Sequence, residues 1–206
     1  MLETPKEYIA KVCNMFKSYG IKSVTMDDVA RELGISKKTL YTHFKDKSDL
    51  VEKILNKEFT DKTEEYALAM ENNSNAIEEV FGYYKLQMKY LTQQRPNFIY
   101  DLKKYYPILF DEFTKHQRDR MINSIKKNIA RGIKEGLFRQ DLNDDIITRL
   151  HVARIISMPT SGMFTTEELL SPVFFAEAFK YHLYAIVSDK GREIVKNNIN
   201  KIIANA

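Results

Sequence analysis

Apolar residues recur every three or four positions along most of this chain, and that spacing most constrains its fold. In the first such segment, Val12, Cys13 and Phe16 would share one face of an α-helix. Only 7 glycines and 5 prolines occur among the 206 residues, which is too few for a β architecture with many turns. We therefore predict an all-α fold, with Cys13 buried in its core.

Capping residues, glycines and prolines divide the chain into about nine or ten predicted helices. The expected boundaries are, in chain order, Gly20, Thr25, Gly34, Ser36, Asp46 or Ser48, Asn72 to Asn75, Pro96, Pro107, Gly136, Asn143, a loop from Met158 to Phe164, Pro172, Val187 and Gly191. The fourth helix should continue to about Glu71. A last, short helix is expected to follow Gly191.

Positive charge is concentrated in residues 36–47, which hold four lysines and one aspartate. This segment carries a net charge of +3, out of +4 for the whole chain. The solvated face of an ordinary helix would explain the charges alone. The two short helices joined by residues 34–36, however, have the spacing of a helix-turn-helix, whose second helix enters the DNA major groove.

The second of these two helices has one apolar and one polar face. Leu40 and Phe44 would face the core. Lys38, Thr39 and Thr42 would face away from it, and they offer the cations, hydroxyls and methyl groups that read base edges. The positive charge of residues 36–47 would then serve to bind DNA.

The pattern from Gly20 to Leu50, G-x4-T-x3-V-A-x2-L-G-I-S-x2-T-L-Y-x-H-F-x-x-K-x2-L, closely resembles the DNA-binding domain of the TetR family of bacterial transcriptional regulators. A looser match covers residues 131–143. The resemblance implies phosphate contacts from Thr25, Tyr41, His43 and Lys47, and base contacts from residues 37–39 and 42. The candidate DNA-binding residues are Thr25, Ser36, Lys37, Lys38, Thr39, Tyr41, Thr42, His43 and Lys47.

The rest of the chain gives no electrostatic reason to bind DNA, because residues 48–206 carry a net charge of only +1. We therefore predict a helix-turn-helix DNA-binding domain of three helices at residues 1–47. A larger helical domain for effector binding and dimerisation would follow at residues 48–206.

Aromatic and sulfur-containing side chains are frequent on the inward faces of the fourth to seventh predicted helices. A plain hydrophobic core would explain them, whereas the family resemblance implies a mostly apolar effector pocket. The candidate pocket residues are Tyr66, Met70, Phe81, Tyr84, Met88, Phe98, Tyr105, Phe110, Phe113 and Met121.

Two later predicted helices, which begin at Asn143 and Pro172, have apolar faces that one protomer need not cover. By analogy with the family, these faces would pair with their symmetry mates in a homodimer. The candidate interface residues are Ile146, Leu150, Ala153, Ile156, Phe175, Ala178, Phe179, Leu183 and Ile186. A two-fold dimer would place two recognition helices roughly 34–36 Å apart on a near-palindromic operator.

We expect a ligand-responsive transcriptional repressor that a small, largely apolar effector releases from double-stranded DNA. The alternative is a helical adaptor that binds protein, which would leave the lysines of residues 37–47 unexplained. No nucleophile lies beside a base and an orienting group, so we expect no enzyme and no cofactor. We also expect no metal, because the acidic residues 141–145 lack the spacing of an EF-hand.

The expected compartment is the cytoplasm, because the chain has one cysteine and no segment that resembles a signal peptide. The longest apolar region, residues 172–187, is interrupted by Glu177, Lys180 and His182. It is therefore not expected to span a membrane.

Overall fold

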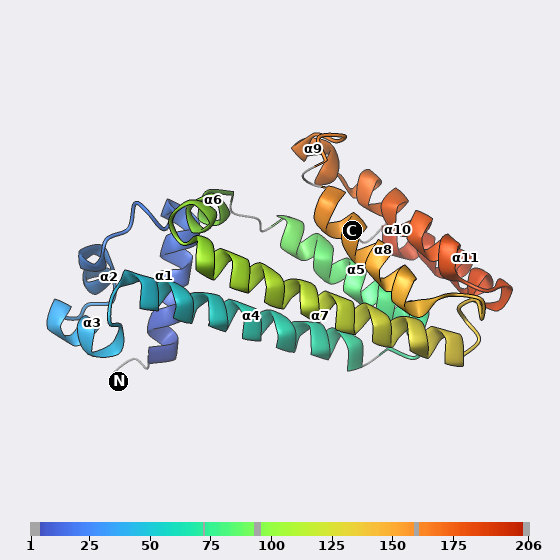
Figure 1. Ribbon diagram of the computed structural model, residues 1–206, viewed down its shortest axis with the longest axis horizontal. Coiled ribbons are helices and arrows are strands. Elements are labelled where there is room, and N and C mark those ends of the chain that lie inside the picture. Colours follow the sequence, from blue (N-terminus) through green and yellow to red (C-terminus); the bar gives the residue numbers. More distant parts are fainter. Residues whose placement is uncertain (1–4, 72, 93–95, 159–160, 204–206) are drawn as a thin grey trace. The chain divides into compact units, whose positions relative to one another are not determined.

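The computed structural model describes residues 5–71, 73–92, 96–158 and 161–203, which form eleven α-helices (Figure 1). These are α1 (Pro5–Tyr19), α2 (Met26–Glu32), α3 (Lys37–His43), α4 (Lys47–Glu71), α5 (Ala76–Thr92), α6 (Pro96–Tyr105), α7 (Pro107–Lys134), α8 (Asp144–Ser157), α9 (Thr166–Leu169), α10 (Pro172–Ile186) and α11 (Asp189–Ile203). The described residues contain no strand beyond one isolated antiparallel bridge between Phe138 and Val187. The predicted all-α fold is confirmed.

Most helices begin and end at the predicted signals. The hydroxyl of Ser36 accepts a hydrogen bond from the Thr39 N–H at 3.0 Å, and the Asn143 side chain caps α8 in the same way. Of the two candidate caps for α4, Asp46 is the one used, because its carboxylate accepts the Asp49 N–H at 2.9 Å. These local hydrogen bonds fix where each helix starts.

Two elements near the C-terminal end differ from the prediction. The four-residue α9 was not predicted, although the Thr165 hydroxyl and the Glu168 carboxylate cap it reciprocally. The last helix, α11, is 15 residues long and passes through Gly191 instead of following it. A Cβ atom on Gly191 would lie 2.1 Å from the Leu137 carbonyl oxygen, so this glycine permits a close approach and marks no helix boundary.

The chain folds as two compact units. Unit 1 comprises residues 1–64 and 94–117, and unit 2 comprises residues 65–93 and 118–206. Both α4 and α7 therefore contribute residues to each unit. The boundary that we predict after residue 47 is a functional one, between DNA binding and effector binding, and it stays a prediction.

Unit 1 holds the two short helices α2 and α3 against a core from α1, α4 and α6. Phe16, Leu40, Phe44 and Leu50 are fully buried in this core. Cys13 is buried there too, as predicted, and burial raises the pKa of its thiol to about 12. A thiol that stays protonated at neutral pH is a packing group and not a nucleophile.

Unit 2 has its main core between α5, α10 and α11, which contact one another. Ile77, Phe138 and Leu183 are fully buried in it. A smaller cluster of Ile125, Ile129 and Val152 packs α7 against α8. Across the described residues, no helix combines the length and the apolar character needed to cross a lipid bilayer.

Candidate nucleic-acid interface and effector pocket

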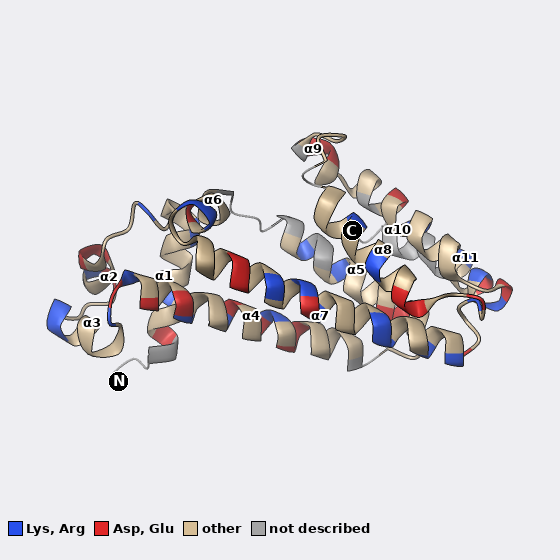
Figure 2. Ribbon diagram, in the orientation of Figure 1, with Lys and Arg blue, Asp and Glu red and all other residues tan. Residues whose placement is uncertain are grey.

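Helix α3 presents a polar face to solvent because its apolar residues Leu40 and Phe44 lie in the core of unit 1. Figure 2 shows basic residues on α3 and acidic residues on α2. The Tyr41 side chain is 49% exposed, which is enough for its ring and hydroxyl to contact DNA directly. The other exposed candidates on this helix are Lys37, Lys38, Thr39 and Thr42.

The hydroxyl groups of this region already have partners within the protein. The Thr42 hydroxyl donates to the Thr39 carbonyl at 2.6 Å. The hydroxyl groups of Thr39 and Ser36 share a hydrogen bond at 2.8 Å, in which either can be the donor. Thr25 donates its hydroxyl proton to the Asp28 carboxylate at 2.6 Å while it caps α2. Because phosphate oxygens only accept hydrogen bonds, Thr25 can donate to DNA only if its hydroxyl turns away from Asp28.

The lysines of the interface differ in how far they are already paired. Lys37 forms an ion pair with Asp27 at 2.6 Å, which joins α3 to α2. Within the described ranges, Lys38 and Lys45 are exposed and form no ion pair. Lys38 is therefore the cation on α3 that is most available to a base edge.

Two further candidates are partly buried and also serve the packing of unit 1. The Lys47 ammonium donates to the Lys22 carbonyl at 3.4 Å and lies 6.0 Å from the centre of the Phe16 ring. Desolvation lowers the pKa of Lys47. His43 contacts the edge of the Tyr8 ring, with 5.8 Å between ring centres. The contacts of His43, the last residue of α3, and of Lys47, the first residue of α4, thus fix where both side chains lie.

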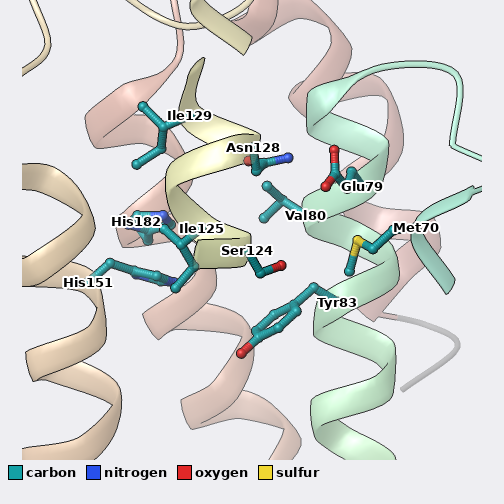
Figure 3. A pocket seen from close by; sticks show the side chains of 10 residues that line it. All are labelled: Met70, Glu79, Val80, Tyr83, Ser124, Ile125, Asn128, Ile129, His151 and His182. Carbon is teal, nitrogen blue, oxygen red and sulfur yellow. The ribbon is translucent and has the colours of Figure 1, made fainter. Parts of the chain in front are cut away.

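Unit 2 contains a cavity of about 30 Å³ between α4, α5, α7, α8 and α10 (Figure 3). Its lining is mixed, with four apolar side chains among polar ones. The lining residues are Met70, Glu79, Val80, Tyr83, Ser124, Ile125, Asn128, Ile129, His151 and His182. A volume of this size holds only about one or two water-sized groups.

Two imidazole rings from different helices stack at this cavity. His151 of α8 and His182 of α10 lie with their ring centres 3.5 Å apart and their planes inclined by 22°. Burial lowers the pKa of His151 to about 2 and that of His182 to about 3, with the cation of Arg154 as a further cause for both. Both rings are therefore neutral at physiological pH.

Hydrogen bonding also determines the tautomer of His151. A guanidinium nitrogen of Arg154 lies 3.2 Å from His151 Nδ1. Since a guanidinium can only donate, Nδ1 must accept, and the ring proton must be on Nε2. His151 thus offers one N–H donor besides the bond to Arg154.

The carboxylate at the cavity is neutralised by a basic partner. Arg131 contacts Glu79 at 3.2 Å and Glu135 at 2.7 Å, and it also donates to the Asn73 carbonyl. The Glu135 carboxylate in turn accepts the N–H of Ala76 at the start of α5. With neutral imidazoles and a paired Glu79, the cavity has no excess charge to attract an ionic ligand.

Comparison with known proteins connects the helix-turn-helix to a family. Residues 10–54 match the sequence pattern described as bacterial regulatory proteins, tetR family. The HTH-type transcriptional repressor KstR2 of Mycolicibacterium smegmatis is 24% identical over 151 residues, which cover 69% of this chain and 71% of the repressor. Residues 10–54 are thus similar to the DNA-binding region of the TetR family of bacterial regulatory proteins.

Two other relatives agree with this assignment. An HTH-type transcriptional regulator of Staphylococcus aureus (SAUSA300_2515) is 53% identical, but over only 36 residues, which cover 18% of this chain and 20% of that protein. The crystal structure of a transcriptional regulator from Cytophaga hutchinsonii shares the fold, with a TM-score of 0.74 and 19% identity over 89% of this chain and 98% of that one. The chain is thus a transcriptional regulator whose N-terminal DNA-binding domain is similar to that of the TetR family.

The residues predicted for the effector pocket of this protein are distributed over several places. Met70 lines the cavity, and the Tyr66 ring contacts that of the lining residue Tyr83 at a tilt of 31°, with 5.1 Å between ring centres. Met121 packs against the cluster that contains Ile125 and Ile129. These three candidates are at or next to the cavity.

The other predicted pocket residues lie elsewhere. Phe81 and Tyr84 are in the main core of unit 2, and the side chain of Met88 lies outside the described residues. Tyr105 is on the surface of unit 1. Phe98 is buried in the core of unit 1, and the partly buried Phe110 and Phe113 pack against that core.

The polar part of the cavity lining was not predicted, and only part of it could have been. Asn128, on an otherwise apolar face of α7, is a signal that sequence reasoning could have used, because a buried amide requires partners. It donates to the Ala76 carbonyl at 2.9 Å. The contact between His151 and His182 could not be predicted from the sequence near either residue, since it depends on how α8 packs against α10.

The predicted dimer residues fall into two groups. On α8, Ile146, Leu150, Ala153 and Ile156 are exposed. On α10 the prediction needs correction, because Leu183 and Ile186 are buried in the core of the protomer itself. The side chain of Phe175 lies outside the described residues, Ala178 is half-buried, and Phe179 packs on Tyr84.

The apolar residues that α10 does expose are different ones. Val173 is 74% exposed and Tyr181 is 75% exposed. Their spacing of eight residues places them on one face of the helix. The helix was therefore predicted, but two of the residues assigned to its exposed face, Leu183 and Ile186, fill the core instead.

The histidine pair predicts that the stability of this protein falls in mild acid. Below their ordinary pKa of 6.5 the two rings bind protons in the unfolded chain, whereas in the fold they stay neutral down to about pH 3. The free energy of unfolding should therefore drop between pH 7 and pH 5, by on the order of 2 kcal/mol per ring. Urea unfolding at the two pH values measures the drop.

The matched variants for this experiment change histidines inside and outside the pair. His151→Gln combined with His182→Gln should remove most of the pH dependence, whereas His116→Gln, at an exposed position, should retain it. An equal drop in the double variant and the wild type would contradict this assignment.

The Lys37–Asp27 ion pair leads to a prediction about DNA affinity. Asp27→Asn frees Lys37 and removes a negative charge from the DNA-facing surface, so the affinity for operator DNA should rise roughly fivefold, the equivalent of one exposed ion pair. Asp141→Asn makes the same charge change in unit 2 and should have little effect. Equal gains in both variants would mean that net charge and not the freed lysine is responsible.

Proposed function

We propose that this protein is a ligand-responsive repressor that binds a near-palindromic operator as a homodimer in the cytoplasm. The observation that carries the proposal is the exposed polar face of α3, with Tyr41 and the unpaired Lys38, next to Lys47 at the start of α4. Lys38 would read a guanine edge and Thr39 a neighbouring base, whereas Tyr41 and Lys47 would contact phosphates.

Dimerisation would use the exposed apolar residues of α8 and α10. Leu150, Val173 and Tyr181 are each more than half exposed in the protomer. The stacked histidines hold α8 next to α10, so these exposed residues come from adjacent helices of unit 2. A two-fold dimer would carry two copies of α3, one for each half-site of a near-palindromic operator.

The effector would be a small, largely apolar molecule with one hydrogen-bonding group. Apolar side chains such as Ile125 and Val80 favour the apolar part, and the Nε2–H of His151 would donate to a carbonyl or hydroxyl oxygen. An ionic group is disfavoured because Glu79 is already paired with Arg131. Most of the aromatic residues that the sequence predicted for the pocket are not among the residues that line this cavity.

Effector binding would release DNA by moving α4. The cavity is too small for a ligand of several heavy atoms, so the helices around it must separate when the ligand enters. Met70 in the cavity lining and Lys47 at the DNA-binding end belong to the same helix. A coupling of about 1–3 kcal/mol would weaken operator binding roughly 5- to 150-fold.

DNA binding can be tested by fluorescence anisotropy with DNA upstream of the protein's own gene and with a scrambled duplex, at two salt concentrations. The wild type should prefer one sequence and lose affinity steeply as salt rises. Tyr41→Ala and Lys47→Ala should each weaken binding about tenfold, and Lys47→Ala should reduce the salt slope by about 1.

Lys127→Ala, at an exposed position of α7 in unit 2, is the control and should bind like the wild type. The proposal fails if the wild type prefers neither duplex and if selection from random DNA also yields no preferred sequence.

The effector site can be tested by screening small apolar molecules for release of the operator complex. Ser124→Leu would fill the cavity, so it should abolish release by an active molecule while operator affinity stays within about twofold. Asn123→Leu places the same side chain at the exposed neighbouring position and should leave release unchanged. Normal release in Ser124→Leu would place the effector site elsewhere.

A further inference from the structure

Unit 1 has a second basic surface outside the helix-turn-helix, formed by Lys22, Tyr100, Lys103, Lys104 and Tyr105, which we call the α6 patch. The Lys22 ammonium lies 5.1 Å from the centre of the Tyr105 ring. Lys104 lies 5.5 Å from the same ring and donates to the Tyr100 hydroxyl at 3.0 Å. These contacts hold cations and phenol groups together at an exposed surface.

The charges of this patch are not neutralised. Among the residues that the structure describes, Lys22, Lys103 and Lys104 form no ion pair, in contrast to Lys37. The nearby carboxylate of Asp101 accepts the backbone N–H of Lys22 at 2.9 Å. Hydrogen bonds with tyrosines raise the pKa of both Lys22 and Lys104, so both remain cations at neutral pH.

The α6 patch is continuous with the predicted DNA-binding residues. Lys47 donates to the carbonyl of Lys22 at 3.4 Å, and Lys22 precedes the α2 cap Thr25 by three residues. Helix α6 contacts α1, and its residues Phe98 and Leu102 are buried in the core of unit 1. The patch is thus held in the same compact unit as α3 (Figure 2).

We propose that the α6 patch binds the sugar-phosphate backbone of the duplex that flanks each operator half-site. The proposal rests on the DNA binding argued above and extends its footprint beyond the bases that α3 reads. Lysine ammonium and tyrosine hydroxyl groups are common donors to phosphate oxygens, and they carry no sequence preference there. The patch adds affinity and salt dependence, and sequence readout stays with α3.

The test measures operator affinity as the duplex is lengthened. The selected operator core is compared with duplexes whose flanks are longer by roughly 5 and 10 base pairs, about half a turn and one turn of DNA. For the wild type, longer flanks of any sequence should raise the affinity roughly fivefold or more. They should also steepen the salt slope by about 0.9 for each added phosphate contact.

Lys103→Gln combined with Lys104→Gln should lose this gain and reduce the salt slope by up to about 2, while it keeps the preference for the core sequence. Lys22→Gln should remove about half of the effect. Lys127→Gln combined with Lys134→Gln makes the same charge change at exposed positions of α7 in unit 2 and should behave like the wild type.

Three results would overturn the proposal. The first is an equal gain from the flanks in the wild type and the Lys103/Lys104 variant. The second is a wild type that binds the core specifically but gains nothing from longer flanks, which would leave the α6 patch to another partner, such as a protein. The third is a wild type without any preference for the core, which would overturn the proposed repressor function as well.

Discussion

The burial of Leu40 and Phe44 in the core of unit 1 is the constraint on which the DNA-binding surface depends. A helix of seven residues has too few hydrogen bonds to be stable alone, so α3 exists because its apolar face is packed against its neighbours. The two buried side chains, four residues apart, also fix the rotation of the helix about its axis. The outward direction of Lys38, Thr39 and Tyr41 follows from that rotation, and so does the surface that α3 offers to DNA.

Much of the fold could be predicted from the sequence because its signals are local. Ser36 and Asn143 mark helix starts by the hydrogen bonds that they accept, and Gly136 follows the end of α7 with a positive φ of 70°. The length of α11 could not be predicted, since the role of Gly191 depends on the Leu137 carbonyl, which lies more than fifty residues earlier in the chain. The Lys37–Asp27 ion pair was missed for a similar reason, because it depends on the angle between two helices.

The candidate effector pocket shows where periodicity is insufficient. The spacing of apolar residues predicts that Phe113 and Tyr84 point inward, but it does not say which core receives each side chain. Phe113 packs in unit 1 and Tyr84 in unit 2, and the cavity is lined instead by a mixed set that includes His151 and His182. These two histidines are 31 residues apart in sequence. Their contact, and with it the polarity of the cavity, is a result of tertiary packing alone.

The small volume of the cavity has a consequence for the speed of a response. A volume of about 30 Å³ is too small for the proposed effector of several heavy atoms, so under that proposal the helices around the cavity must separate before the ligand can enter. The apparent dissociation constant then equals the intrinsic one divided by the fraction of open molecules. At high ligand concentration the observed binding rate should level off at the opening rate, because encounter with the ligand no longer limits it. A regulator with this property responds to a rise in its ligand on a time scale set by its own helix packing.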